Sequence, residues 1–173
     1  MKHQAGVTLI ELMICVALLA IVLNLSISGF SYLRESQNQQ ITRESLASSL
    51  NSARQAAVTK RKVVYMCPTS NSGQSCSADK ADWAKGWMAY AEVDAINGYT
   101  AGDTRIFIYE NKSSSSAKLE TTGASTQVIF KPNGIVTATT FNICSGITPS
   151  ENHTIEINVL GAISKESAAD AAC

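Results

Sequence analysis

Gly6-Val7-Thr8-Leu9-Ile10-Glu11 opens the stretch that decides the fold, and it leads into an apolar run that ends at Leu25. Within that run, the twelve residues from Leu12 to Leu23 are apolar without a break. The six residues in front of the valine contain one firmly charged side chain, Lys2. A single carboxylate, Glu11, therefore stands at the start of a long apolar segment, and its presence there needs a physical reason.

Two ordinary interpretations fit parts of this stretch. The nineteen residues from Val7 to Leu25 approach the roughly 20 that a helix needs to span a bilayer. A secretory signal is the second interpretation, because Ser26-Ile27-Ser28 fits a small-x-small cleavage site. Glu11 argues against both, since a charged group in a membrane helix costs about 2.5–3.5 kcal/mol on insertion scales and usually marks a function.

The same stretch resembles the N-terminus of the type IV prepilins and of the related pseudopilins of type II secretion. In that family a dedicated prepilin peptidase cuts after the glycine of a Gly-(hydrophobic)-Thr-Leu-Ile-Glu motif and methylates the new N-terminus, and this chain matches at every position. The resemblance implies that Gly6 ends a short leader and that Val7 becomes the N-methylated first residue after cleavage. Glu11 then occupies the position of the family's glutamate.

The charge of Glu11 also suggests its role in assembly. The positive end of a helix favours a carboxylate in the first turn, and the amine freed at Val7, of the same chain or of a neighbour, could pair with it. A buried carboxylate is costly when it is unpaired, whereas one paired with an incoming subunit would define the register in which helices stack. We therefore expect Glu11 to act in docking between subunits.

Composition indicates one modest domain outside the cytoplasm. A length of 173 residues corresponds to about one domain. The chain has 14 basic and 14 acidic residues, and removal of Lys2 with the leader leaves 13 basic residues and a formal charge of −1. Such a balance provides no long-range attraction for nucleic acid or anionic lipid.

Cysteine usage agrees with an exported domain. Cys15 lies in the apolar run and is interpreted as a small residue that faces lipid or a partner. The other four cysteines allow three disulfide pairings in an oxidising compartment, and we favour Cys67–Cys76 and Cys144–Cys173. A metal site is the rival interpretation, but Cys67 and Cys76 are too far apart for a Cys-x-x-Cys knuckle and no histidine lies near them. We therefore expect no metal and no cofactor.

A helical pattern continues from Val7 to about Lys60, and no proline occurs before Pro68. Gly29 is a point where this helix could bend. Beyond Gly29 the apolar positions thin out to one stripe with helical spacing. The stripe consists of Ile41, Leu46, Leu50, Ala53, Ala57 and Val58. We expect the first half of the helix to embed in the membrane or the filament core, and the second half to pack on a globular head.

The rest of the chain has the pattern of short strands separated by loops rich in Ser, Asn and Gly. The expected strands are 63–66, 86–91, 105–109, 128–130, 135–136, 140–144 and 154–159, with a turn at Gly161 that leads into 162–163. Because no βαβ alternation is present, antiparallel pairing is favoured. The predicted fold class is α+β, with a long N-terminal helix packed on an antiparallel β-sheet head, as in type IV pilins.

Four segments are expected along the chain. They are the prepilin leader peptide (1–6), the transmembrane or filament-core half of the helix (7–30), its amphipathic half (31–61) and a periplasmic β-rich head similar to the GspH/FimT class (62–173).

The head is similar to the GspH/FimT/FimU class in the order of several short motifs. These are the Ala56-to-Arg61 helix end, a strand that ends in Met66-Cys67-Pro68, Asp82-Trp83 followed by Gly86-Trp87-Met88, Val128-Ile129-Phe130 with Asn133-Gly134, Phe141-x-x-Cys144, and Ile155-x-Ile157 followed by Gly161. We expect Trp83 and Trp87 to fill the core rather than to stack on a ligand. Asp82 or Gly86 would then shape the turn between them.

Catalytic patterns are weak in this chain. His153 is the only histidine beyond the leader, and we expect it at the surface near the end of a strand. The sequence contains no activated Ser or Cys motif, no carboxylate dyad signature and no phosphate-cradling glycine loop. We do not expect an enzyme.

The resemblance implies a FimU-like minor pilin, a structural subunit of a type IV pilus that helps to initiate assembly and supports twitching motility and adhesion. Its expected partners are the prepilin peptidase, other minor and major pilins and the pilus assembly platform. It would lie in the bacterial inner membrane with its head in the periplasm before assembly, and in the pilus fibre at the cell surface afterwards.

Two alternatives are a GspH-like pseudopilin of a type II secretion system and a FimT-like minor pilin that binds DNA for natural transformation. The FimT-like DNA readers carry arginines near the C-terminal strand and tail. Residues 161–173 contain Lys165 as the only cation, although phosphate binding depends on clustered Lys and Arg. The basic run Lys60-Arg61-Lys62 is explained by a solvated helix end at the negative pole of the helix. DNA is therefore not an expected partner.

Overall fold

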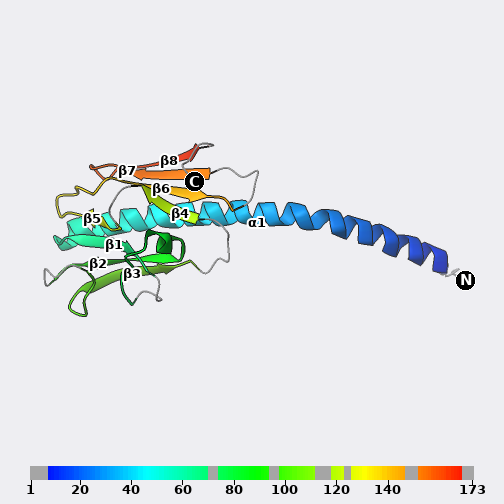
Figure 1. The fold of residues 1–173 in the computed structure, drawn as a ribbon, viewed down its shortest axis with the longest axis horizontal. Helices are drawn as coiled ribbons and strands as arrows, with labels where there is room; N and C mark the ends of the chain where they lie inside the picture. The colour runs from blue at the N-terminus through cyan, green and yellow to red at the C-terminus, as the bar shows by residue number, and fades with distance from the viewer. Residues whose placement is uncertain are drawn as a thin grey trace, which may run out of the picture. The chain divides into compact units, whose positions relative to one another are not determined.

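The computed structural model describes residues 8–69, 74–93, 98–111, 118–122, 126–146 and 152–168, with the backbone alone at 24–31 and at 168. The described residues form one long helix, a short 3₁₀ helix and eight strands (Figure 1). The chain divides into two compact units, Met1–Arg34 and Glu35–Cys173.

The helix α1 extends from Leu9 to Lys60 and is helical through Gly29. Its C-terminal end agrees with the prediction from the sequence. The residue that follows, Arg61, has a φ of 53°, which is the left-handed conformation that commonly ends a helix and is usually adopted by glycine. Lys60, Arg61 and Lys62 are exposed at this end.

One face of α1 packs in the head, and it is narrower than the predicted stripe. Leu46, Leu50, Ala53 and Ala57 are fully buried, whereas Ile41 is 58% exposed and Val58 is 48% exposed. The expectation for these two residues was wrong. A residue advances by about 100° around a helix, so Ile41, five residues before Leu46, and Val58, one residue after Ala57, fall outside the buried face.

Two four-stranded antiparallel sheets form the head. The first has the order β3-β2-β1-β5 and the second the order β4-β6-β7-β8. The strands are β1 (Val64–Pro68), β2 (Gly86–Ala91), β3 (Thr104–Glu110), β4 (Lys118–Thr122), β5 (Val128–Phe130), β6 (Thr139–Cys144), β7 (Asn152–Ile157) and β8 (Ile163–Ala168), and η1 (Lys80–Ala84) is the 3₁₀ helix before β2. The α+β class is confirmed, and the division into two sheets is not indicated by the sequence pattern.

A single core joins α1 to both sheets. The buried side chains of α1 share one cluster with Val64 and Phe130 of the first sheet and with Phe141 and Ile155 of the second. In Figure 1 the C-terminal part of α1 lies between β1, β2 and β3 on one side and β6, β7 and β8 on the other. Apolar residues alternate along β1 and β6 to reach this core, which is the period-2 pattern of strands with one buried face.

A second, smaller cluster lies on the opposite face of the first sheet. Cys67, Met88 and Tyr90 are fully or almost fully buried there. They alternate with residues of the main core because neighbouring residues of a strand point to opposite faces. Loop residues, including Cys76 and Tyr99, pack against this cluster, so the first sheet is covered on both faces.

Candidate functional site

The first turn of α1 is built around Thr8. Its carbonyl oxygen accepts hydrogen bonds from the backbone N–H groups of Glu11 (3.1 Å) and Leu12 (3.2 Å), and its hydroxyl oxygen lies 3.4 Å from the Glu11 nitrogen. A threonine at this position satisfies N–H groups that lack partners at the start of a helix. The exposed Glu11 carboxylate therefore lies in the first turn, where the positive end of the helix dipole stabilises it.

The helix that follows Thr8 presents apolar side chains on all sides. Every residue from Leu9 to Leu23 is exposed, and Leu9 and Leu23 are 78% and 63% exposed. A helix that is apolar all round is normally covered by other protein or by lipid. Cys15, within this segment, is a free and exposed thiol.

Within the residues described, no helix combines the length and the apolar character needed to cross a membrane.

Two expected sites fall beyond the described residues. Gly6 and Val7, the predicted cleavage and methylation positions, lie outside them, and so does Cys173. Cys144, the expected partner of Cys173, ends β6 and is itself disulfide-bonded.

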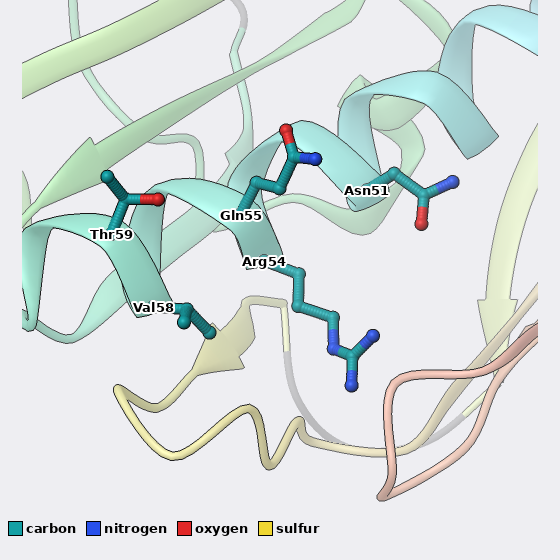
Figure 2. A pocket seen from close by; sticks show the side chains of 5 residues that line it. All are labelled: Asn51, Arg54, Gln55, Val58 and Thr59. Atoms are coloured by element: carbon teal, nitrogen blue, oxygen red, sulfur yellow. The ribbon is translucent and has the colours of Figure 1, made fainter.

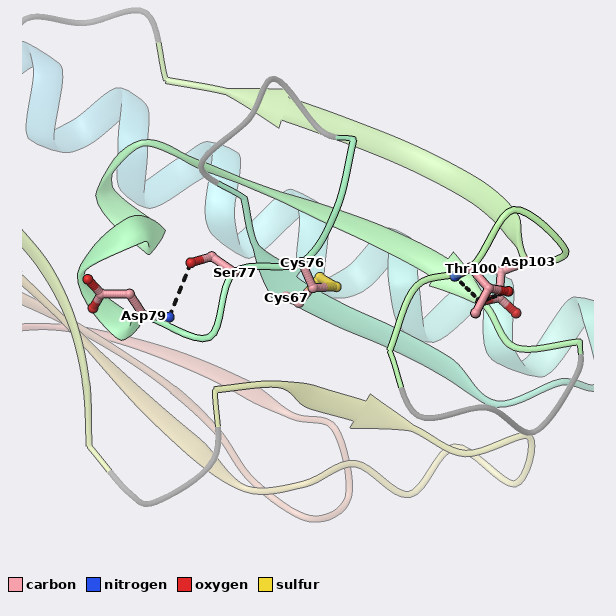
Figure 3. The surroundings of a disulfide bond; sticks show 6 residues. All are labelled: Cys67, Cys76, Ser77, Asp79, Thr100 and Asp103. Carbon is pink, nitrogen blue, oxygen red and sulfur yellow. Dashed lines mark hydrogen bonds between the residues drawn. A yellow bond between two sulfur atoms is a disulfide. The ribbon is translucent and has the colours of Figure 1, made fainter.

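Cys67 and Cys76 form a disulfide, with their Cα atoms 5.6 Å apart (Figure 3). Cys67 lies in β1, and the bond ties the chain after β1 to the outer face of the first sheet. Hydrogen bonds hold the loop near the other end of this face. There the Asp103 carboxylate accepts from the backbone N–H groups of Val93 and Thr100, at 2.9 Å in both cases.

Between the disulfide and the Asp103 hydrogen bonds, this face contains stacked tyrosines. The rings of Tyr65 and Tyr90 are stacked with centroids 5.4 Å apart, and Tyr99 packs on Tyr90 edge to face. Burial raises the pKa of the Tyr90 hydroxyl. The Tyr65 hydroxyl donates a 3.2 Å hydrogen bond to Glu92. This arrangement is a packed aromatic layer and leaves no room for a stacking ligand beside Tyr90, which is 1% exposed.

The two tryptophans are core residues, as expected from the sequence. Trp83 is 1% exposed and Trp87 is fully buried, and Trp83, in η1, packs edge to face on Phe141 of the second sheet. The buried Asp82 accepts hydrogen bonds from Lys85 (2.6 Å) and from the Ser77 hydroxyl. The Lys85 ammonium and then Ser77 hold the pKa of the Asp82 carboxyl below its usual range.

His153 is buried, which contradicts its expected surface position. It lies in β7 on the same face as Ile155, which is the face turned toward the core. Its Nδ1 atom lies 3.5 Å from the Arg43 guanidinium of α1 and 3.4 Å from the Ser167 hydroxyl of β8. Nearby, Lys165 of β8 forms an ion pair with Glu44 of α1. These contacts attach the edge of the second sheet to the helix.

Among the described residues no cluster of His, Cys, Asp and Glu side chains has the composition of a metal site.

Arg54 is a structural residue that the sequence did not reveal. Its guanidinium donates a hydrogen bond to the carbonyl of Leu160 (2.8 Å) and a longer one to that of Gly134 (3.4 Å). It thereby links α1 to the turn after β5 and to the turn between β7 and β8. Gly161 leaves room for this side chain, because an added Cβ would lie 2.3 Å from Arg54 Nε and would force the guanidinium to shift, and the φ of 75° also favours glycine. Figure 2 shows Arg54 directed away from the helix axis. With Asn51, Gln55, Val58 and Thr59 it lines a hollow of about 400 Å³.

A helix that begins with an apolar segment and a glutamate in its first turn, and that ends packed between antiparallel sheets, defines a protein of the type IV pilin class. Solved structures support this fold. The type IV minor pilin FimU of Pseudomonas aeruginosa is 20% identical, with a TM-score of 0.60 over 78% of this chain and 92% of FimU. A second crystal form of FimU has a TM-score of 0.56 at 21% identity, over 73% of this chain and 91% of that one.

The minor pseudopilin EpsH from the type 2 secretion system of Vibrio cholerae is also similar in fold. It is 13% identical, with a TM-score of 0.52 over 75% of this chain and 97% of EpsH. No curated protein matches the chain in sequence.

Sequence signatures identify the family. The family described as type II transport protein GspH matches residues 42–161, and the prokaryotic N-terminal methylation motif matches residues 1–23. The chain belongs to the GspH family. It is a GspH/FimU-like member of the minor pilins and pseudopilins, whose members are structural subunits.

Proposed function

We propose that this protein is a minor pilin of a type IV pilus that takes part in initiating fibre assembly, in a priming or tip complex, and so supports twitching motility and adhesion. The observation that carries the proposal is the exposed apolar segment of α1, which has one carboxylate in its first turn and precedes a GspH-type head. An apolar surface of this extent needs a cover. Other helices of the same kind, assembled around the filament axis, would provide it.

Processing and location are part of the same proposal and rest on the methylation motif. A prepilin peptidase would cut after Gly6 and methylate Val7, and the subunit would wait in the inner membrane with its head in the periplasm. The assembly platform would then add it to other pilins. No catalytic role is proposed for any residue.

Glu11→Ala tests the docking role. We expect the variant to be cleaved normally but to be found in sheared fibres at about one tenth of the wild-type level, because a buried amine would lose its carboxylate partner. Quantitative immunoblots of sheared fibres and of the membrane fraction give the ratio, and mass spectrometry of the mature protein gives its N-terminus. Glu120→Ala, which removes an exposed carboxylate from β4, is the matched control.

Normal incorporation of Glu11→Ala would contradict the docking role, and a mature N-terminus at any residue other than Val7 would contradict the processing.

A pseudopilin of a type II secretion system is the second candidate, favoured by the GspH family signature and the EpsH-like fold. Deletion of the gene that encodes this chain distinguishes the minor pilin from the pseudopilin. Loss of surface fibres with normal protein secretion supports the minor pilin, whereas accumulation of secreted proteins in the periplasm with normal fibres supports the pseudopilin.

A further inference from the structure

Exposed cations gather where α1 ends. Val64 of β1 pairs with Phe130 of β5 in an antiparallel register, so the residues just outside this pair, Lys62 and Lys131, leave the two strands at the same end. Lys60 and Arg61, at the end of α1, precede β1 at this end too. All four of these cations are exposed.

Arg54 adds a fifth cation one to two helical turns before the end of α1. Its hydrogen bonds go to the neutral carbonyls of Gly134 and Leu160, so its charge is not balanced by them. Arg43, Lys85 and Lys165 form ion pairs elsewhere in the described part of the head. The Glu92 carboxylate lies at the same end of the sheet, because the Glu92 N–H donates to the carbonyl of Val63 (3.1 Å) and its side chain accepts from the Tyr65 hydroxyl.

Apolar side chains and two hollows lie among these cations. Val58, Ile135 and Leu160 are 48%, 43% and 71% exposed. The turn from Lys131 to Ile135 separates the hollow beside Arg54 and Val58 from a second hollow of about 500 Å³, which is lined by Val63, Tyr65, Ile129, Lys131, Pro132 and Asn133. Each hollow therefore has at least one cation and at least one apolar side chain in its wall.

Arg61 belongs to the same group of cations and occupies a backbone position that favours glycine. Its φ of 53° is a conformation that glycine adopts without strain and that arginine adopts only at a cost. A charged residue at such a position suggests a role other than ending the helix.

We propose that this helix-end surface, made of Arg54, Val58, Lys62, Lys131, Ile135 and Leu160 together with the neighbouring Arg61, binds an acidic and partly apolar segment of another pilin-type subunit. Carboxylates of the partner lie against Arg54 and Lys131, and its apolar side chains enter the two hollows. The inference rests on the proposed function, because it requires that the chain meets other subunits. A protein partner is favoured over a nucleic acid because exposed aliphatic side chains add nothing to the binding of phosphates.

The test uses the full chain in cells that assemble it, with a photo-crosslinking amino acid in place of Leu160. We expect a crosslink to another pilin-type subunit, mapped by mass spectrometry to a segment that contains Asp or Glu. The Arg61→Gly/Lys131→Gln double variant should lower the crosslink yield about fivefold, since each exposed ion pair contributes modestly. Arg61→Gly suits this purpose because glycine fits the backbone conformation.

Lys118→Gln is the matched control, since it removes an exposed cation from β4, in the sheet that does not carry Lys131, and it should leave the yield unchanged. An unchanged yield in the double variant would overturn the inference, and so would a crosslink to a segment without carboxylates. Salt-sensitive retention of a DNA duplex by the purified full chain in micelles, abolished by the double variant, would also overturn it in favour of nucleic acid.

The two proposals fail differently. If wild-type protein is absent from fibres and from pilin complexes, the proposed function fails. If wild-type protein is incorporated but the double variant gives the same crosslink yield, only the assignment of the surface is wrong.

Discussion

Single residues determine how closely the strands of the first sheet can approach. Gly86 opens β2 with a φ of 146°, and an added Cβ would lie 2.3 Å from the carbonyl oxygen of Tyr109 on the neighbouring strand. Only a glycine allows β2 and β3 to pair at this point. Asp82 and Trp83, which precede this glycine, lie in η1, and the Asp82–Lys85 ion pair stabilises the turn that leads into β2.

Gly86→Ala should lower the free energy of unfolding by at least about 3 kcal/mol, because strain in the backbone adds to a clash with a backbone atom that cannot move away. Gly98→Ala is the matched control. Gly98 also has a positive φ, of 99°, but no atom of the described residues lies within 4 Å of an added Cβ, so its cost should be about 1 kcal/mol. Urea titrations of the full chain, followed by the fluorescence of Trp83 and Trp87, measure both values. Equal losses in the two variants would show that the contact with Tyr109 is unimportant.

At the same scale, the sequence predicted some side-chain positions and missed others. The burial of Trp83 and Trp87 could be predicted because large apolar side chains within a β pattern usually enter a core. The burial of His153 could not, since it depends on Arg43, which is 110 positions away in sequence. The contacts of Arg54 could not be predicted either, because its two carbonyl partners are 80 and 106 positions away in sequence.

Elements were predictable where their own pattern was strong. The end of α1 at Lys60 follows from the loss of helical spacing before Val63 and Pro68. Strand β4 was missed, and β8 was expected only at 162–163, because each contains a single large apolar residue, Leu119 or Ile163. Both are edge strands, and their pairing is set by the neighbouring strand rather than by an alternation of their own.

The covered outer face of the first sheet depends on the disulfide at the element scale. The Cys67→Ala/Cys76→Ala variant should lose about 2–3 kcal/mol of stability, because a cross-link across a separation of nine residues restricts the unfolded chain by roughly that amount. Thermal unfolding of the full chain in micelles, under non-reducing conditions, gives the difference. Cys15→Ala, which removes the exposed free thiol, should leave the melting temperature unchanged. A double variant as stable as the wild type would mean that packing of the tyrosine layer alone holds the loop.

On the scale of the whole molecule, the chain consists of two units with different needs. The unit Glu35–Cys173 contains the shared core, both sheets and the described disulfide. The unit Met1–Arg34 contains the exposed apolar helix and no core of its own among the described residues. Stability is therefore expected to come from the larger unit, and the packing of helices in a filament from the smaller one.

A fragment that begins at Glu35 should fold by itself and unfold at the same urea concentration as the full chain in micelles, within about 0.5 kcal/mol. Urea titrations that follow the fluorescence of the two core tryptophans make this comparison. A fragment that begins at Leu46 is the control, since it lacks the Arg43 and Glu44 contacts to β7 and β8 and should be destabilised. A marked loss of stability in the longer fragment would show that the head needs the apolar helix.

The hydrogen bonds of Arg54 limit which segments of this head can be replaced in a chimera. One guanidinium on the helix closes a turn of each sheet, and Gly161 leaves the space that it fills. A chimera in which only the β7–β8 hairpin is replaced would contain a turn that is not shaped to accept the hydrogen bond of Arg54. We therefore expect a graft to keep both sheets attached to the helix only if the arginine, the two turns and the glycine are transferred together.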